Sequence, residues 1–342
     1  MRRFQKLLAV AAPVIVAAAG INAGSASAAT RSTPLTMLQW QAEIGQVPAV
    51  GGGCFHASFP VLSWQAVQCA MTPAQPLAPS HNGAPETVGN GHDYTAVVSG
   101  SISSATGTFT NVSSKITEKG QINASGPEKA NQFSLQLNTQ FFSGSPACAK
   151  ASNPSNCLAW QQFVYTTSPN IVFMQYWLID YNHACPSGWF TDSNDCYTNS
   201  AEASLGGKAL TAKSLATLSL SGSAKAGGTD QVEVITGGKA TLATGKDTKI
   251  DLAAHWNTTE WDLFGDGGGG EAFFGKNTTI EAVTTITATS SSAPDCVVEG
   301  FTGETNNLSL AATPALGSAT APTIGTKQTN GTTGTASCAV AS

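Results

Sequence analysis

Short runs in which apolar and polar residues alternate fill the chain from Tyr94 onward. Clear examples are 132–142 (QFSLQLNTQFF), 160–167 (WQQFVYTT), 171–181 (IVFMQYWLIDY), 259–266 (TEWDLFGD) and 279–288 (TIEAVTTITA). Clusters of Gly, Asn, Pro and Ser separate these runs, which is typical of strands joined by turns. The pattern predicts an all-β protein, an antiparallel β-sandwich of the concanavalin-like jelly-roll kind with long loops. Helices are expected only at 36–44 (TMLQWQAEI) and near 201–218 (AEASLGGKALTAKSLATL).

Alternation also predicts which side chains share a face, because successive strand residues point to opposite sides. In 259–266, Glu260 and Asp262 fall on one face, and Trp261 and Leu263 are expected in the core. The run 160–167 divides in the same way, into the two sets Trp160, Gln162, Val164 and Gln161, Phe163, Tyr165.

The two ends of the chain differ in amino-acid composition and pattern from the strand-rich middle. Residues 1–28 combine positive charge, a short apolar stretch and a small-residue cleavage site, which is the pattern of a secretory signal peptide. We expect an irregular N-terminal or pro-segment at 29–90, the sandwich at 91–311, and an Ala/Thr/Gly-rich tail at 312–342. A pro-segment at 29–90 would block the groove of the sandwich. This hypothesis rests on the change of sequence pattern near residue 94, from irregular to alternating.

Charge narrows the possible partners. Removing Arg2, Arg3 and Lys6 from the 16 basic residues leaves 13 against 21 acidic ones, a net charge of about −8. No basic patch suggests nucleic acid. No later stretch reaches the ~20 apolar residues that a membrane span needs. We therefore expect a secreted, extracellular monomer that acts on a polypeptide or a polysaccharide, without nucleic acid, membrane, cofactor or metal.

Eight cysteines follow the predicted signal peptide, an even number that predicts disulfides in an oxidising compartment. Pairing nearest neighbours gives four bridges, the last of which ties the tail back to the body. These are Cys54–Cys69, Cys148–Cys157, Cys185–Cys196 and Cys296–Cys338. The chain has no C-x-x-C or H-E-x-x-H motif, so a metal site is not expected.

Four segments, in order along 94–285, resemble the glutamic peptidases of the eqolisin type and, more distantly, the neprosin peptidases. They are YTAVVSGSISSATGTFTNV, WQQFVY, MQYWLIDY and TEWDLFGD. The resemblance implies a catalytic glutamine at Gln162 and a catalytic glutamate at Glu260, with Gln161 as the neighbouring alternative. Gln175, Trp177, Trp160 and Asp262 are further candidates for lining the substrate groove. Two departures are Phe163, where the family has a small residue, and the loops at 148–157 and 185–196.

A Glu–Gln dyad has the chemistry that peptide hydrolysis needs. The carboxylate acts as general base toward water and then as acid toward the leaving amine. The amide NH₂ stabilises the oxyanion. Burial beside Trp177 or Trp261 would raise the pKa of Glu260, so we expect an acidic pH optimum.

Two other functions compete with a secreted acid endopeptidase. Some sandwich-fold glucan hydrolases carry a second carboxylate four or five residues after the first, but Phe264 and Gly265 occupy those positions here. A non-catalytic, lectin-like carbohydrate-binding module is the remaining alternative, because a fold does not fix a function.

Overall fold

Two large β-sheets packed face to face make up most of the chain. The computed structural model describes residues 34–71, 74–80, 88–317 and 319–342. The predicted signal peptide at 1–28 lies outside them. Within Leu35–Ser342, which form one unit, all but one of the strand pairings are antiparallel. The predicted all-β sandwich is confirmed.

The first sheet has ten strands within the described residues. In spatial order they are β2 (Gln65–Val67), β1 (Cys54–Ser58), β15 (Lys239–Lys246), β14 (Thr229–Thr236), β13 (Leu218–Ser223), β4 (Ile102–Thr110), β18 (Thr279–Ala288), β22 (Thr323–Thr329) and β21 (Ser309–Leu310), with β23 (Cys338–Ala341) also paired to β22.

The second sheet has nine strands and carries the segments that resemble a peptidase. Their order is β10 (Phe190–Asp192), β11 (Asp195–Asn199), β9 (Ile171–Ile179), β8 (Leu158–Thr166), β7 (Ser134–Thr139), β16 (Thr258–Phe264), β3 (Tyr94–Val97) and β19 (Asp295–Val298), with β12 (Ala203–Ser204) paired to β9. A small sheet holds β20 (Thr305–Asn306), β17 (Glu271–Phe274), β5 (Glu118–Gly120) and β6 (Lys129–Ala130).

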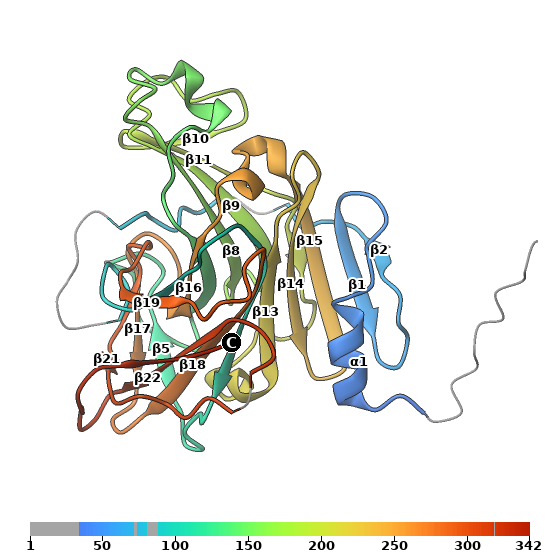
Figure 1. Ribbon diagram of the computed structural model, residues 1–342, viewed down its shortest axis with the longest axis vertical. Helices are drawn as coiled ribbons and strands as arrows, with labels where there is room; N and C mark the ends of the chain where they lie inside the picture. The colour runs from blue at the N-terminus through green and yellow to red at the C-terminus, as the bar shows by residue number, and fades with distance from the viewer. Residues whose placement is uncertain (1–33, 72–73, 81–87, 318) are drawn as a thin grey trace, which may run out of the picture. The chain divides into compact units, whose positions relative to one another are not determined.

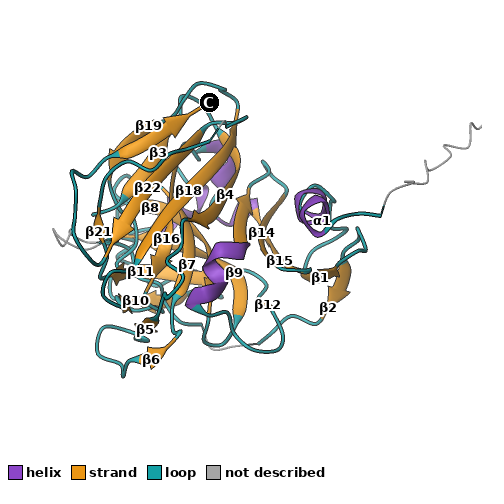
Figure 2. Cartoon of the chain, turned by 90° about the horizontal axis from the view of Figure 1, so that it is seen from below, coloured by secondary structure: helices purple, strands orange, loops and turns teal. Residues whose placement is uncertain are grey.

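Helix α1 (Met37–Ile44) confirms the first helix prediction and lies beside β1 and β15 (Figures 1 and 2). Thr36 caps it: its hydroxyl accepts from the Gln39 amide, and the Gln39 side chain accepts from the Thr36 amide. Trp40 and Ile44, four residues apart, are buried on one face. The other described helices are the short 3₁₀ helices η1 (Pro146–Lys150), η2 (Ala212–Thr217), η3 (Asp247–Lys249) and η4 (Leu252–Ala254).

Two glycines leave room for large aromatic rings between the two large sheets. A Cβ at Gly222 would lie 2.5 Å from the Phe163 ring, and one at Gly107 would lie 2.0 Å from the Trp261 ring. Neither distance is possible for a real side chain. Phe163 therefore fits because the facing strand leaves it room. Trp261 and Leu263 lie in the core between the sheets, as the alternation predicts.

The structure adds detail at both ends of the chain and corrects the expectation of a second helix. The region 201–218 contains β12 and the 3₁₀ helix η2 in place of an α-helix. The segment 29–90 is not wholly irregular, since β1 pairs with β15 over five residues. Within 312–342, β22 and β23 are strands of the ten-stranded sheet, because Thr residues suit a half-buried strand despite the low-complexity composition.

All four predicted disulfides are confirmed: Cys54–Cys69, Cys148–Cys157, Cys185–Cys196 and Cys296–Cys338. Bridges in this number are typical of proteins that fold in an oxidising compartment. None of the described helices is long and apolar enough to span a membrane.

Candidate functional site

A row of polar side chains crosses the nine-stranded sheet on the face turned away from the other large sheet. Directly paired residues of neighbouring antiparallel strands point to the same face. The row therefore places Gln162 and Glu260 on one face, two strands apart. From β11 to β3 its members are Asn199, Gln175, Gln162, Asn138, Glu260 and Thr95.

Side-chain hydrogen bonds connect Gln162 to Glu260 through two residues of β7. Gln162 Nε2 donates to Gln136 Oε1 at 3.0 Å. Asn138 Nδ2 donates to the same oxygen at 3.2 Å and to Glu260 Oε2 at 2.9 Å. Trp177 Nε1 donates to Gln162 Oε1 at 3.1 Å, which turns the NH₂ of that amide toward β7 and Glu260.

Glu260 faces a second carboxyl group, Asp93. Asp93 comes two residues before Thr95, the partner of Glu260 on β3, and therefore shares its face. Neither Asp93 oxygen nor Glu260 Oε1 has a hydrogen-bond partner within the described residues. The two carboxyl groups are close enough for each to affect the pKa of the other.

The environment decides which carboxyl of the pair ionises first. Burial, and then the charge of Glu260, raises the pKa of Asp93 well above its ordinary value of 3.8. Burial also raises the pKa of Glu260, but the interaction with Asp93 and hydrogen bonds from Asn138 and the Phe301 amide offset part of that effect. Glu260 is thus the member that ionises first as the pH rises, while Asp93 keeps its proton to higher pH.

Most of the other predicted site residues lie on the same face. Gln175 and Trp177 join the row through a hydrogen bond of 3.0 Å from Trp177 Nε1 to Gln175 Oε1. Trp160 packs against Trp177 with ring centroids 6.3 Å apart. Asp262 is hydrogen-bonded to Gln328 of β22, a strand of the other large sheet, and its burial raises its pKa to about 7, which that hydrogen bond offsets in part.

Gln161, the alternative to Gln162, points the other way. Its Nε2 donates to Asp230 Oδ2 at 3.3 Å, and its side chain is buried between the two large sheets. A side chain in that position cannot meet Glu260. Of the two neighbouring glutamines, the register places only Gln162 on the face that holds the carboxyl pair.

Sequence reasoning missed three members of this site: Gln136, Asn138 and Asp93. The run SLQLNT has the alternation of its neighbours, and its polar positions 136 and 138 fall on one face. That parity, and the position of Asp93 two residues before Thr95, are the signals that could have identified them. Pairing between strands distant in sequence was needed to bring the three together.

Two segments far apart in sequence cover the face. We call residues 74–80 and 299–304 the cap. Its halves join each other, since Ser80 N donates to Phe301 O at 2.8 Å and Gly303 N to Ala78 O at 2.6 Å. Beneath it, Glu260 and Gln162 are both 0% exposed.

The N-terminal half of the cap contacts the site through its backbone N–H and C=O groups. Leu77 N donates to Gln175 Oε1 at 2.7 Å, and Gln175 Nε2 donates back to Gln75 O at 2.9 Å. The Leu77 side chain is buried in an apolar cluster with Val164, Ile171 and Phe173. The segment 74–80 is thus held through its backbone N–H and C=O groups, with one side chain in an apolar cluster.

The glycine run after β16 also holds the cap through hydrogen bonds. Gly267, Gly268 and Gly269 have φ of 81°, 54° and 71°, a left-handed backbone that favours glycine. This turn directs amides inward, so that Gly268 N donates to Pro76 O at 2.8 Å and Gly269 N to Glu304 Oε1 at 3.0 Å.

Among the described residues, no group of three or more His, Cys, Asp or Glu is placed to hold a metal ion. The chemistry available on this face is that of carboxyl groups, amides and indole N–H donors. Such groups can move protons and stabilise an oxyanion.

Comparison with known proteins leaves the family open. No protein-family model and no curated protein matches the chain. A structure of SCP-B, a member of the eqolisin family of peptidases in complex with the tripeptide Ala-Ile-His, aligns at 10% identity and a TM-score of 0.30. Scytalido-glutamic peptidase with a peptide-based transition state analog aligns equally well. Each alignment covers 70% of this chain and 98% of the other. A TM-score this low carries no functional argument, so function is argued from the residues.

Proposed function

We propose that the chain is a secreted acid endopeptidase of the glutamic type, with Glu260 and Gln162 as its catalytic dyad. The observation that carries the proposal is the segment 74–80, held through its backbone by Gln175 on the face that holds both residues. A face that binds its own chain through backbone hydrogen bonds has the chemistry to bind another polypeptide. The four disulfides and the predicted signal peptide support secretion.

In the proposed mechanism Glu260 is the general base and Gln162 the electrophile. Glu260 takes a proton from water, which then attacks the scissile carbonyl, and returns the proton to the leaving amine. Gln162 Nε2 stabilises the developing oxyanion. Its orientation is fixed by the bond from Trp177 Nε1 to its Oε1. Asp93, which keeps its proton to higher pH than Glu260, lowers the pKa of Glu260 in part.

The cap must leave before a substrate can enter, because Glu260 and Gln162 are fully covered. We propose that residues 29–90 are a pro-segment, so that cleavage near residue 90 frees the N-terminal half of the cap. Mass spectrometry of an acid-activated sample tests this step. An active sample with an intact N-terminus at Ala29 would show that cleavage is not required.

Casein digestion at pH 2–5 tests the dyad. We expect Glu260→Gln and Gln162→Ala to lose about 100-fold to 1,000-fold in rate, the effect of removing one oxyanion donor elsewhere. Gln161→Leu is the matched control on the same strand, because its side chain faces away from Glu260. It should stay within about threefold of the wild type.

Circular dichroism of each variant confirms that it is folded. Equal rates for the wild type and Glu260→Gln would remove Glu260 from the mechanism. A wild-type sample with no activity after acid incubation would contradict the endopeptidase proposal as a whole.

A further inference from the structure

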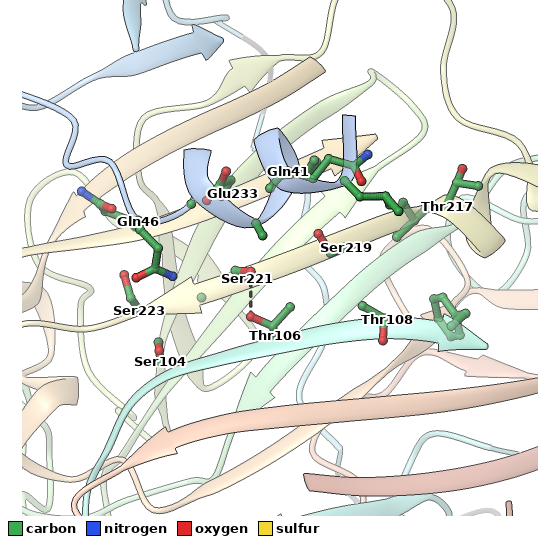
Figure 3. A pocket seen from close by; sticks show the side chains of 18 of the residues that line it. Gln41, Gln46, Ser104, Thr106, Thr108, Thr217, Ser219, Ser221, Ser223 and Glu233 are labelled. Atoms are coloured by element: carbon green, nitrogen blue, oxygen red, sulfur yellow. Dashed lines mark hydrogen bonds between the residues drawn. The ribbon is translucent and has the colours of Figure 1, made fainter. Parts of the chain in front are cut away.

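A concave site lies on the outer face of the ten-stranded sheet, on a different sheet from the dyad. It is a groove of about 630 Å³ between helix α1 and the strands β4, β13 and β14 (Figure 3). That volume is within the usual range of small-molecule sites. We call it the hydroxyl groove, after the side chains that form its floor.

The floor is a regular grid of short polar side chains. Outward-facing residues of the three strands pair in register, about 4.8 Å apart across the strands and about 7 Å apart along them. Eight of the nine positions are polar. The three rows are Gln231–Ser223–Ser104, Glu233–Ser221–Thr106 and Ile235–Ser219–Thr108.

Most of these groups are free to bind a ligand. Thr106 and Ser221 share a hydrogen bond of 2.9 Å, drawn dashed in Figure 3. The hydroxyls of four others have no side-chain hydrogen bond within the described part of the chain: Ser104, Thr108, Ser219 and Ser223. No Lys or Arg lines the groove, so the floor offers neutral donors and acceptors.

Glu233 is the exception in this neutral surface. It is 7% exposed, its Oε1 has no hydrogen-bond partner, and it lies against helix α1 near Gly45 (Figure 3). A buried carboxyl without a partner destabilises a fold. Its presence at the edge of a ligand-sized groove indicates a use other than packing, because an apolar residue of the same size would stabilise the fold more.

We propose that the hydroxyl groove binds a neutral oligosaccharide. Sugar hydroxyls both donate and accept, which matches Ser and Thr hydroxyls, and a carboxyl group at the edge of the groove can accept from a sugar hydroxyl. Leu38 of α1, which also lines the groove, is 78% exposed and offers an apolar surface to the C–H face of a sugar ring. A peptide fits less well, since the floor is the face of a sheet whose backbone groups are already paired.

Isothermal titration with cello-, laminari-, xylo- and chitohexaose tests the proposal. The full chain carries Glu260→Gln, so that no result depends on the proposed peptidase. We expect one of these hexaoses to bind, and Ser221→Trp, which fills the middle of the groove, to weaken it at least tenfold. Thr287→Val, an exposed position on the same sheet face outside the groove, is the matched control and should bind as the parent does.

Glu233→Leu separates a binding role from a structural one. We expect this variant to melt at a higher temperature than its parent at pH 7.5 and to bind the hexaose at least tenfold more weakly. A lower melting temperature with unchanged binding would assign Glu233 a structural role and overturn the proposal. The proposal would also be overturned if none of the hexaoses bound, if Ser221→Trp bound as tightly as the parent, or if only a lysine-rich peptide bound.

Discussion

Replacing Glu118 by Gln should make the fold less sensitive to rising pH. Glu118 of β5 is 3% exposed, and neither of its oxygens has a hydrogen-bond partner. Burial raises its pKa from 4.5 to about 8, and the charge of Asp266 adds to the effect. The amides of Asn131 and Gln132 lower the pKa in part, although their geometry falls short of a hydrogen bond.

The direction of the effect follows from where the proton is bound. Because the folded pKa is above the unfolded one, the folded state holds the proton between pH 4.5 and about 8 and the unfolded state does not. Stability from this group is complete below pH 4.5 and is lost as the pH rises through 8. The loss is about 1.4 kcal/mol per pH unit, or about 3 kcal/mol between pH 4.5 and pH 7.

Such a loss is a large part of a typical unfolding free energy of about 5–15 kcal/mol. Burial also raises the pKa of Asp230, Glu233 and Asp262, each to about 7. Together these groups would exceed the whole stability if they all ionised in the folded state. We therefore expect the wild type to be most stable at acid pH and to unfold or loosen near pH 8.

Urea unfolding, followed by circular dichroism at pH 4 and pH 7, measures the effect. At pH 4, Glu118→Gln should match the wild type within about 1 kcal/mol, and at pH 7 it should be more stable by about 3 kcal/mol. Glu128→Gln, at an exposed position, is the control and should shift neither value. A difference between variant and wild type that stays constant from pH 4 to pH 7 would refute the reasoning, as would a wild type that is most stable at pH 8.

Three further predictions concern packing, the carboxyl pair and the cap. Gly222→Ala should lower the unfolding free energy by about 1–3 kcal/mol, because its methyl group would overlap the Phe163 ring, and an unchanged melting temperature would contradict this contact. Asp93→Asn keeps a donor near Glu260 but cannot ionise, so the upper limb of the pH–rate profile on casein should move to higher pH. An upper limb that does not move would show that Asp93 does not affect the ionisation of Glu260. Leu77→Asp puts a charge into an apolar cluster and should raise the acid activity of the full-length chain at least tenfold, while a lower rate would show that the cap does not inhibit.

Period-two alternation was enough to predict the sandwich and the faces of its central strands. It placed Glu260 and Asp262 together and Trp261 in the core, because a half-buried strand leaves that pattern in any sequence. It could not show that Gln162 and Glu260 flank the same strand, since that depends on pairing between segments about 100 residues apart. The cap is also invisible in sequence, because 74–80 carries no strand pattern and is ordered by contacts with distant residues.

Composition misled at the C-terminal end. The stretch 312–342 is rich in Ala, Thr and Gly, which predicts a loose tail, yet β22 pairs with β18 over seven residues. Small and β-branched side chains suit the outer part of a large sheet, where packing on a neighbouring strand matters more than hydrophobicity. Cys338 gave the one reliable signal, because its bridge to Cys296 requires the tail to return to the body.

The positions of the disulfides determine how the N-terminal half of the cap can be released. Cys54–Cys69 closes within the N-terminal segment, and the other three bridges all join residues beyond 147. No covalent link except the main chain therefore crosses residue 90. A single cut there would leave the segment attached by non-covalent contacts alone, chiefly the ladder between β1 and β15 and the hydrogen bonds of residues 74–80. Departure of that fragment would need no reducing agent, and dilution after the cut would make it a one-way event.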